Sequence, residues 1–156
     1  VMEDAIQVED ENGAFISAEL PKLGMITSIE VAERSASGVV TRLLIRGSEH
    51  AVSISGQSNI RAILNPVHQE IVRQDGSTVT GWTSLPSPYY YVENTETGFG
   101  VHGGGFGHGA GMSIYGAGVL GRQGKSYKYI LRHYFSYVDF ASIYTMEDGE
   151  QMTDSK

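Results

Sequence analysis

The stretch from Gly98 to Gly124 constrains the fold of this 156-residue chain most, because it holds twelve of the twenty glycines. Glycine inside a helix or a central strand costs conformational entropy and offers no packing surface. Large side chains lie between these glycines, whereas a flexible linker would be rich in glycine and serine. We therefore expect glycine to shape the backbone, with Gly103–Gly105 and Gly107–Gly111 forming a bulged strand and a tight loop.

Two short helices are expected after this loop. Apolar residues recur at helical spacing in two runs: Met112, Tyr115, Val119 and Leu120, then Tyr127, Ile130, Leu131 and Tyr134. The first helix should begin at Gly111 or Ser113 and end near Gly121 and Gly124. Gly116, Ala117 and Gly118 make this helix weak but thin, so that it can lie close against a sheet or a second helix. The second helix should begin at Ser126, with its apolar stripe facing the core.

From Phe135 onward the apolar period drops to two, which predicts a closing strand. Its apolar members are Tyr137, Val138, Phe140, Ile143 and Tyr144.

Residues 13–94 are typical of β structure. The expected elements are a hairpin of residues 26–34 and 39–46, a strand at 52–54, a helix at 57–64, a hairpin at 70–73 and 78–80, and a strand at 89–92. Ser58 is the expected helix cap, Asp75-Gly76 marks the turn of the second hairpin, and Thr95–Gly98 is the turn after the last strand. The chain therefore predicts an α+β domain, mainly antiparallel sheet with about three short helices.

The net charge of −7 is concentrated at the two ends. Nine of the eighteen acidic residues lie there: Glu3, Asp4, Glu9, Asp10, Glu11, Glu147, Asp148, Glu150 and Asp154. We interpret residues 1–23 and 145–156 as acidic, solvated ends that flank a lobe of residues 24–144. A near-neutral middle without a basic patch argues against nucleic-acid binding and is compatible with a glycan ligand.

Other sequence features exclude some classes of site. The chain has no cysteine, so disulfides, thiolate metal sites and cysteine nucleophiles are excluded. It contains no apolar run of 18 residues and no signal-peptide pattern. Val1 in place of an initiator methionine predicts a processed product or a piece of a longer protein.

Three histidines and Ser113 are candidates for chemical roles. His108 suits a general base, a ligand or a substrate hydrogen-bond donor, and also a histidine that only holds its loop. His102, His108 and His133 resemble a metal-ligand set, but no carboxylate has matching spacing, so we expect neither metal nor cofactor. Ser113 is more typical of a helix cap than of a nucleophile, because Gly-Met-Ser-Ile-Tyr-Gly is not a nucleophile elbow. The Gly107–Gly111 loop lacks the Lys-Ser/Thr pair of a phosphate-binding loop.

Several carboxylates and aromatic residues are candidates for binding or cleaving a glycan. Glu70, Glu93 and Glu96 are the acids nearest to the glycine-rich loop, and the last two are expected to decorate a turn. Trp82 and Tyr89–Tyr91 are candidates for a sugar-stacking groove, although alternate tyrosines of a strand must point into the core. Arg61 is expected to pair with a carboxylate structurally.

One run of residues resembles a known family. Residues 107–117 read GHGAGMSIYGA and are followed by Gly124 and the segment YKYILRHY. This resembles the C-terminal signature GHGxGMSxxGA of the stage II sporulation protein D family, the SpoIID/LytB domain shared with amidase enhancers. The segments at residues 26–38 and 54–64 also resemble that family in the order of its segments, so the resemblance covers roughly residues 24–144.

The resemblance implies a peptidoglycan lytic transglycosylase of sporulation or the cell wall. Its catalytic glutamate would lie in an N-terminal helix of the type P-x-E-A-L-K-A-Q-A-V-A-A-R-T, which this chain lacks. The chain thus resembles the C-terminal lobe alone, forming one wall of the glycan groove and inactive in isolation. The substrate-binding residues implied are His108, Gly109, Gly111, Ser113 and Tyr115.

The implied partners are peptidoglycan glycan strands and the missing N-terminal half of the domain, with self-association expected through exposed apolar surface. The implied location is extracytoplasmic, at the cell wall or the sporulation septum and forespore membrane. Two alternatives stay open. One is a non-catalytic peptidoglycan-binding or structural module, and the other is a metal-dependent hydrolase that uses the three histidines.

Overall fold

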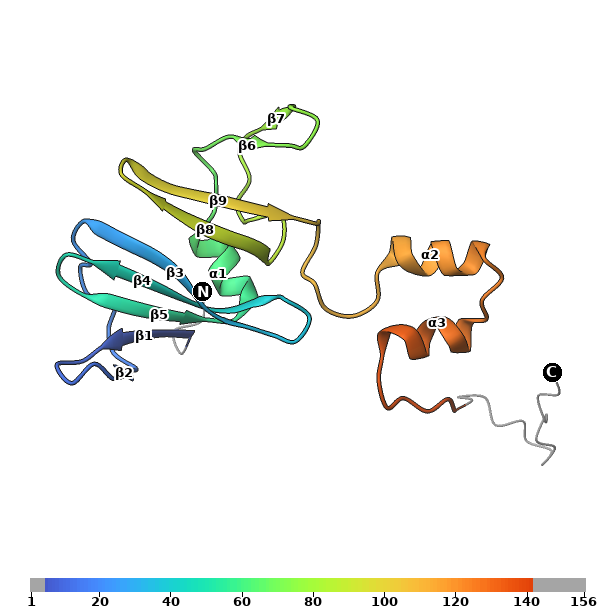
Figure 1. Ribbon diagram of the computed structural model, residues 1–156. Coiled ribbons are helices and arrows are strands. Elements are labelled where there is room, and N and C mark those ends of the chain that lie inside the picture. The colour runs from blue at the N-terminus through green and yellow to red at the C-terminus, as the bar shows by residue number, and fades with distance from the viewer. Residues whose placement is uncertain (1–4, 142–156) are drawn as a thin grey trace. The chain divides into compact units, whose positions relative to one another are not determined.

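The computed structural model describes residues 5–141, which form two compact units divided between Gly109 and Ala110 (Figure 1). We call residues 5–109 the sheet unit and residues 110–141 the helical unit, and each is described by itself. No helix within these residues is long and apolar enough to cross a membrane.

An antiparallel five-stranded sheet forms the body of the sheet unit, in the order β2-β1-β5-β4-β3. Its strands are β1 (Ile6–Glu9), β2 (Phe15–Ile16), β3 (Ile26–Arg34), β4 (Val40–Gly47) and β5 (Ala51–Ser55). Helix α1 (Gln57–Ile63) packs against β4 and β5 (Figure 1). The most deeply buried core side chains are Val40, Leu43, Val52, Ile54 and Ile60. The core therefore lies between α1 and the middle strands of the sheet.

Most of the elements expected in this part of the chain are confirmed. The hairpin of β3 and β4, the strand β5 and the helix α1 occupy the expected residues. Asp75-Gly76 turns the hairpin of β6 (Ile71–Val72) and β7 (Thr78–Val79). The cap expected at Ser58 is wrong: α1 is preceded by Gly56 without a side-chain cap, and the Ser58 hydroxyl accepts from the Gln57 amide at 2.9 Å. Strands β1 and β2 place part of residues 1–23 inside the sheet.

The hairpin of β8 (Tyr89–Thr95) and β9 (Gly98–Gly104) has the expected Thr95–Gly98 turn. Its register runs without interruption from Thr95 opposite Gly98 to Tyr89 opposite Gly104. The bulge expected at Gly103–Gly105 is therefore wrong. A Cβ atom on Gly103 would lie 2.5 Å from the Tyr89 carbonyl oxygen, so glycine serves here to bring β9 close to β8.

Side chains attach this hairpin to β3, the edge strand of the larger sheet. The Asn94 amide accepts from the Ile29 backbone N–H at 3.0 Å and donates to the Ile29 carbonyl at 3.3 Å. At the C-terminal end of β3, the Arg34 guanidinium donates to the Tyr90 carbonyl at 2.6 Å and to the Gly38 carbonyl at 3.1 Å. These bonds hold β8 beside β3 (Figure 1). Some backbone groups at the otherwise open edge of β3 therefore have hydrogen-bonding partners.

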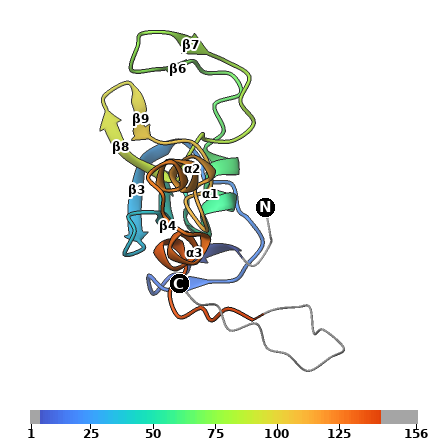
Figure 2. The same ribbon diagram turned by 90° about the vertical axis from the view of Figure 1, so that its right-hand side faces the viewer.

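The helical unit contains α2 (Ile114–Arg122) and α3 (Tyr127–Tyr134), which lie side by side and are seen end-on in Figure 2. Both expected N-caps are confirmed. The Ser113 hydroxyl accepts from the Gly116 N–H at 3.1 Å, and the Ser126 hydroxyl accepts from the Tyr129 N–H at 3.2 Å. Helix α2 ends with the Gly124 N–H on the Gly121 carbonyl and the Lys125 N–H on the Leu120 carbonyl, the pair of bonds of a Schellman motif.

Gly116 allows the close approach of the two helices, as expected. A Cβ atom at this position would overlap the Tyr134 hydroxyl, whereas one on Gly118 would meet only the Arg122 guanidinium at 3.8 Å. Within the helical unit by itself, no residue of 110–141 is fully buried, so the expected burial of the α3 stripe stays a prediction. The contact between α2 and α3 does not bury their apolar stripes fully within the unit.

The closing strand expected from Phe135 is absent within the described residues 135–141. Ser136 and Tyr137 form a turn in which Tyr137 has a φ of 57°. A strand requires a partner for its backbone hydrogen bonds, and the described residues of the helical unit supply none. Ile143 and Tyr144 lie outside the described residues.

Replacing Asn94 should loosen the hairpin from the sheet. Asn94→Ala removes both bonds to Ile29, so we expect a loss of about 1 kcal/mol in the free energy of unfolding. Hydrogen exchange should show faster exchange of the Ile29 amide. Gln74→Ala, in the exposed turn between β6 and β7, is the control. An unchanged Ile29 exchange rate in Asn94→Ala would contradict the proposed attachment.

Two glycines of α2 should respond in opposite ways to alanine. Gly118→Ala should stabilise α2 by about 1 kcal/mol, because alanine is the better helix former and the new methyl meets only ordinary contacts. Gly116→Ala should not stabilise α2, because the new methyl group displaces the Tyr134 ring and this offsets the higher helix propensity of alanine. Amide exchange of α2 and nuclear Overhauser contacts to Tyr134 measure both effects. Equal stabilisation by the two substitutions would refute the close packing at Gly116.

Candidate functional site

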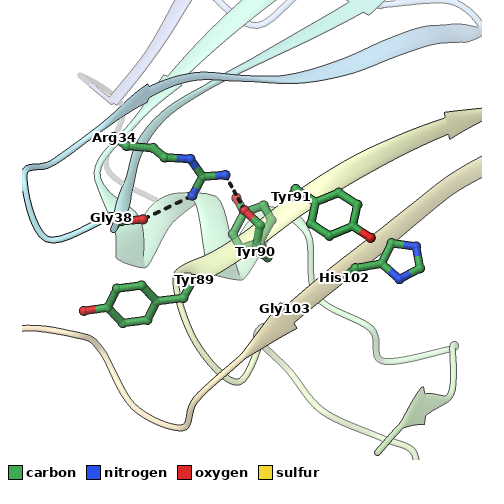
Figure 3. A pocket seen from close by; sticks show the side chains of 7 residues that line it. All are labelled: Arg34, Gly38, Tyr89, Tyr90, Tyr91, His102 and Gly103. Carbon is green, nitrogen blue, oxygen red and sulfur yellow. Dashed lines mark hydrogen bonds between the residues drawn. The ribbon is translucent and has the colours of Figure 1, made fainter. Parts of the chain in front are cut away.

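A shallow hollow of about 470 Å³ lies where β8 and β9 meet the end of β3 (Figure 3). The residues that line it are Arg34, Gly38, Tyr89, Tyr90, Tyr91, His102 and Gly103. All of them belong to the sheet unit. Three consecutive tyrosines, a guanidinium and an imidazole therefore border one open depression.

The three tyrosines of β8 alternate as a strand requires. Tyr90 is 5% exposed and joins the core, whereas Tyr89 is half-buried and Tyr91 is 58% exposed. Burial raises the pKa of the Tyr90 phenol to about 12, although the nearby Arg34 charge acts in the opposite direction. Tyr90 is therefore a neutral core residue, and Tyr89 and Tyr91 remain as the aromatic groups at the hollow, as the expected alternation requires.

The exposed wall of the hollow is a stack of Tyr91 and His102 (Figure 3). The two residues are directly opposite in the β8–β9 register, and their rings lie 5.0 Å apart at an angle of 16°. The imidazole Nε2 of His102 lies 3.1 Å from a carboxylate oxygen of Glu93. Gly100 faces Glu93 across the hairpin, and a Cβ atom there would lie 2.8 Å from His102 Nε2. The absence of a side chain at Gly100 therefore gives the imidazole room to reach Glu93.

The Glu93–His102 contact was missed by sequence reasoning, which placed Glu93 in a turn. Glu93 lies within β8, and only Glu96 occupies the turn. The signal was available, because a turn spanning Thr95–Gly98 puts Tyr91 opposite His102 by counting back along both strands. Among residues 5–141, no group of three or more histidines, aspartates or glutamates is arranged to hold a metal ion.

Two other expectations for side chains near this site are wrong. Trp82 does not line the hollow but packs edge-to-face with Phe106, with ring centres 5.7 Å apart. Arg61 pairs with backbone rather than with a carboxylate, since it donates to the carbonyls of Leu85 at 2.7 Å and Pro86 at 3.3 Å. Arg61 thereby holds the segment that leads into β8, where the Pro86 carbonyl also accepts from the Gly107 N–H at 3.0 Å.

The boundary between the two units divides the residues of the glycine-rich signature. His108 and Gly109 end the sheet unit, where His108 is exposed and the Tyr89 hydroxyl donates to the Gly109 carbonyl at 3.4 Å. Gly111, Ser113 and Tyr115 belong to the helical unit. The Ser113 hydroxyl caps α2, and Tyr115 is 89% exposed. Their role in substrate binding stays a prediction.

Comparison with curated proteins gives two partial matches. The chain is 40% identical over 58 residues to the amidase enhancer of Bacillus subtilis (strain 168), covering 37% of this chain and 8% of that protein. It is 54% identical over 37 residues to stage II sporulation protein D of Bacillus amyloliquefaciens, covering 24% of this chain and 11% of that protein. The chain thus matches about a tenth of the length of these relatives. No solved structure matches the chain.

Both relatives carry the names to which the signature points, so the resemblance to stage II sporulation protein D is confirmed. A family model described as a domain of unknown function (DUF8618) matches residues 7–111, from β1 to the glycine-rich loop. This match spans more than half of the chain, which therefore belongs to the DUF8618 family and is related to stage II sporulation protein D.

Proposed function

We propose that this chain holds glycan strands of peptidoglycan, as the C-terminal lobe of a cell-wall or sporulation protein of the stage II sporulation protein D type. It would act outside the cytoplasm, at the cell wall or the forespore surface. The observation that carries the proposal is the exposed Tyr91–His102 stack beside the hollow. The names of the two relatives support a cell-wall ligand.

The hollow has the chemistry that a sugar ring requires. The C–H faces of a pyranose pack on aromatic rings, while its hydroxyl and acetamido groups need fixed hydrogen-bonding partners. Tyr89 and Tyr91 supply aromatic surface on the same face of β8. Glu93 fixes the His102 ring at 3.1 Å, so its second nitrogen is oriented for a sugar hydroxyl. Pre-orientation of this kind reduces the entropy lost on binding.

The glycine-rich loop is proposed as a second part of the glycan-binding surface. In this proposal His108, Ser113 and Tyr115 make polar contacts, and Gly109 and Gly111 allow a strand to approach the backbone. The exposure of His108 and Tyr115 supports this assignment.

The catalytic step would come from elsewhere in the assembled protein. A lytic transglycosylase protonates the leaving oxygen with a carboxylic acid, and the 6-hydroxyl of the sugar closes on the anomeric carbon to give an anhydro product. Such an acid needs a raised pKa, which burial supplies. Every aspartate and glutamate of residues 5–141 is at least partly exposed. We therefore propose that this chain binds without cleaving and relies on an N-terminal half for the acid, or functions as a non-catalytic module.

Replacing Tyr91 should weaken glycan binding. Tyr91→Ala removes the aromatic surface at the hollow, and loss of one stacking contact should lower the affinity for GlcNAc–MurNAc oligomers by about five- to tenfold. Titration calorimetry measures the affinity. Tyr137→Ala, which removes the same side chain from a fully exposed position in the helical unit, is the matched control. An equal affinity for Tyr91→Ala and wild type would reject the hollow as the glycan site.

The purified chain alone should release no anhydromuropeptides from peptidoglycan sacculi, because its described carboxylates lack the burial of a general acid. Mass spectrometry of the soluble fraction measures release, with an active lytic transglycosylase as the positive control. Release by the chain alone that is abolished by Glu93→Gln would contradict the proposal that this chain binds glycan without cleaving it. It would not contradict the proposal that glycan binds at the hollow.

A further inference from the structure

The outer edge of β9 has no strand partner within the described chain. Strand β8 lies between β9 and β3 (Figure 1), and β8 and β9 form a sheet of two strands. Thr95 and Gly98 pair across a two-residue turn, so each bonds to the backbone of the other. Because bonding alternates along an antiparallel pair, the backbone groups of Phe99, Val101 and Gly103 point away from β8. No other described segment bonds to these outward groups.

This edge lacks the features that usually keep an open edge from pairing. Soluble proteins protect such edges with lysine, proline or a β-bulge. Residues Gly98–Gly104 contain neither lysine nor proline, and their register with β8 is uninterrupted. Phe99 and Val101 are 38% and 40% exposed along the edge. Both the backbone and these apolar side chains therefore suit contact with another strand.

The strand β9 matches its own edge in an antiparallel register centred on Val101. A two-fold axis at Val101 pairs this residue with its equivalent in a second copy, and it pairs Phe99 with Gly103 of that copy. These are the three residues whose backbone groups point outward, so each of these pairs is of the hydrogen-bonded type. The same register places Gly100 opposite His102 of the second copy.

Side-chain size and charge also fit this register. The Phe99 ring would lie beside a glycine, and aromatic residues stabilise glycines across a strand pair. Like charges directly opposite each other would be unfavourable, but Gly98–Gly104 contains no aspartate, glutamate, lysine or arginine. The net charge of −7 is therefore not concentrated at this edge.

We propose that two copies of this chain pair through their β9 strands and form one four-stranded sheet in the order β8-β9-β9-β8. A second copy is the occupant because it supplies both the register and the match of large residues to glycines. The interface is small, so the dimer is weak and depends on protein concentration. It covers Phe99 and Val101 of both copies.

Dimerisation would double the candidate glycan site. Side chains that share a face of one strand share it with their cross-strand neighbours, so the Tyr91–His102 stacks of both copies lie on one face of the sheet. A glycan strand long enough to reach both stacks would bind more tightly than a disaccharide, because the second contact is intramolecular. This consequence rests on the proposed function, whereas the dimer itself does not.

The first test is sedimentation velocity of the full chain over a range of concentrations. Val101→Pro removes the central outward N–H, and proline is tolerated on an edge strand where that N–H faces solvent. We expect it to raise the dissociation constant of the dimer about tenfold or more, since the two bonds of the central pair are disturbed. Val101→Thr keeps the N–H and a strand-favouring branched side chain, so it is the matched control and should stay within about threefold of wild type.

The second test uses the absence of cysteine from the chain. Val101→Cys introduces a single thiol at the two-fold axis, where the Cα atoms of the pair would lie about 5.5 Å apart, a spacing that a disulfide spans. Thr97→Cys, in the exposed turn of the same hairpin, is the control. Its equivalent in the second copy would lie roughly 27 Å away, eight residues along the strands. Mild oxidation should link Val101→Cys into dimers well before Thr97→Cys.

Three results would overturn the dimer: a monomeric wild type at every concentration, equal dissociation constants for Val101→Pro and Val101→Thr, or equal crosslinking of the two cysteine variants. Circular dichroism establishes that Val101→Pro keeps its fold. The glycan site is tested separately, because Tyr91→Ala should weaken glycan binding and still dimerise as wild type does. Equal affinity of wild type and Val101→Pro for long glycan oligomers would overturn only the doubled site.

Discussion

The attachment of the β8–β9 hairpin to the edge of β3 determines what the sheet unit can present to a ligand. Asn94 and Arg34 replace the backbone ladder that would otherwise join β8 to β3. Because side chains make the bonds, the hairpin stays a separate two-stranded sheet, and a hollow remains beside it. Arg34 donates to two backbone carbonyls, so we interpret it as a residue that builds the hollow and orients Tyr90 toward the core.

The local elements were predictable because their signals are local. Turn sequences fixed the hairpins, and serine at the start of an apolar stripe fixed both N-caps of the helical unit. Asn94 and Ile29 are 65 residues apart, and no pattern in either segment specifies the other. The stripes of α2 and α3 likewise identified an apolar face without saying what covers it, and the structure leaves that face uncovered within the unit.

The candidate site likewise has one part that the sequence indicates and another that only the structure shows. The glycine-rich signature stood out in the sequence because its composition is unusual, yet its residues fall in both units. The Tyr91–His102 stack was hidden, since each residue is ordinary by itself and their pairing comes from the hairpin register. Gly100 illustrates the difference. In the sequence it is one glycine among many, and in the structure it leaves the space through which His102 reaches Glu93.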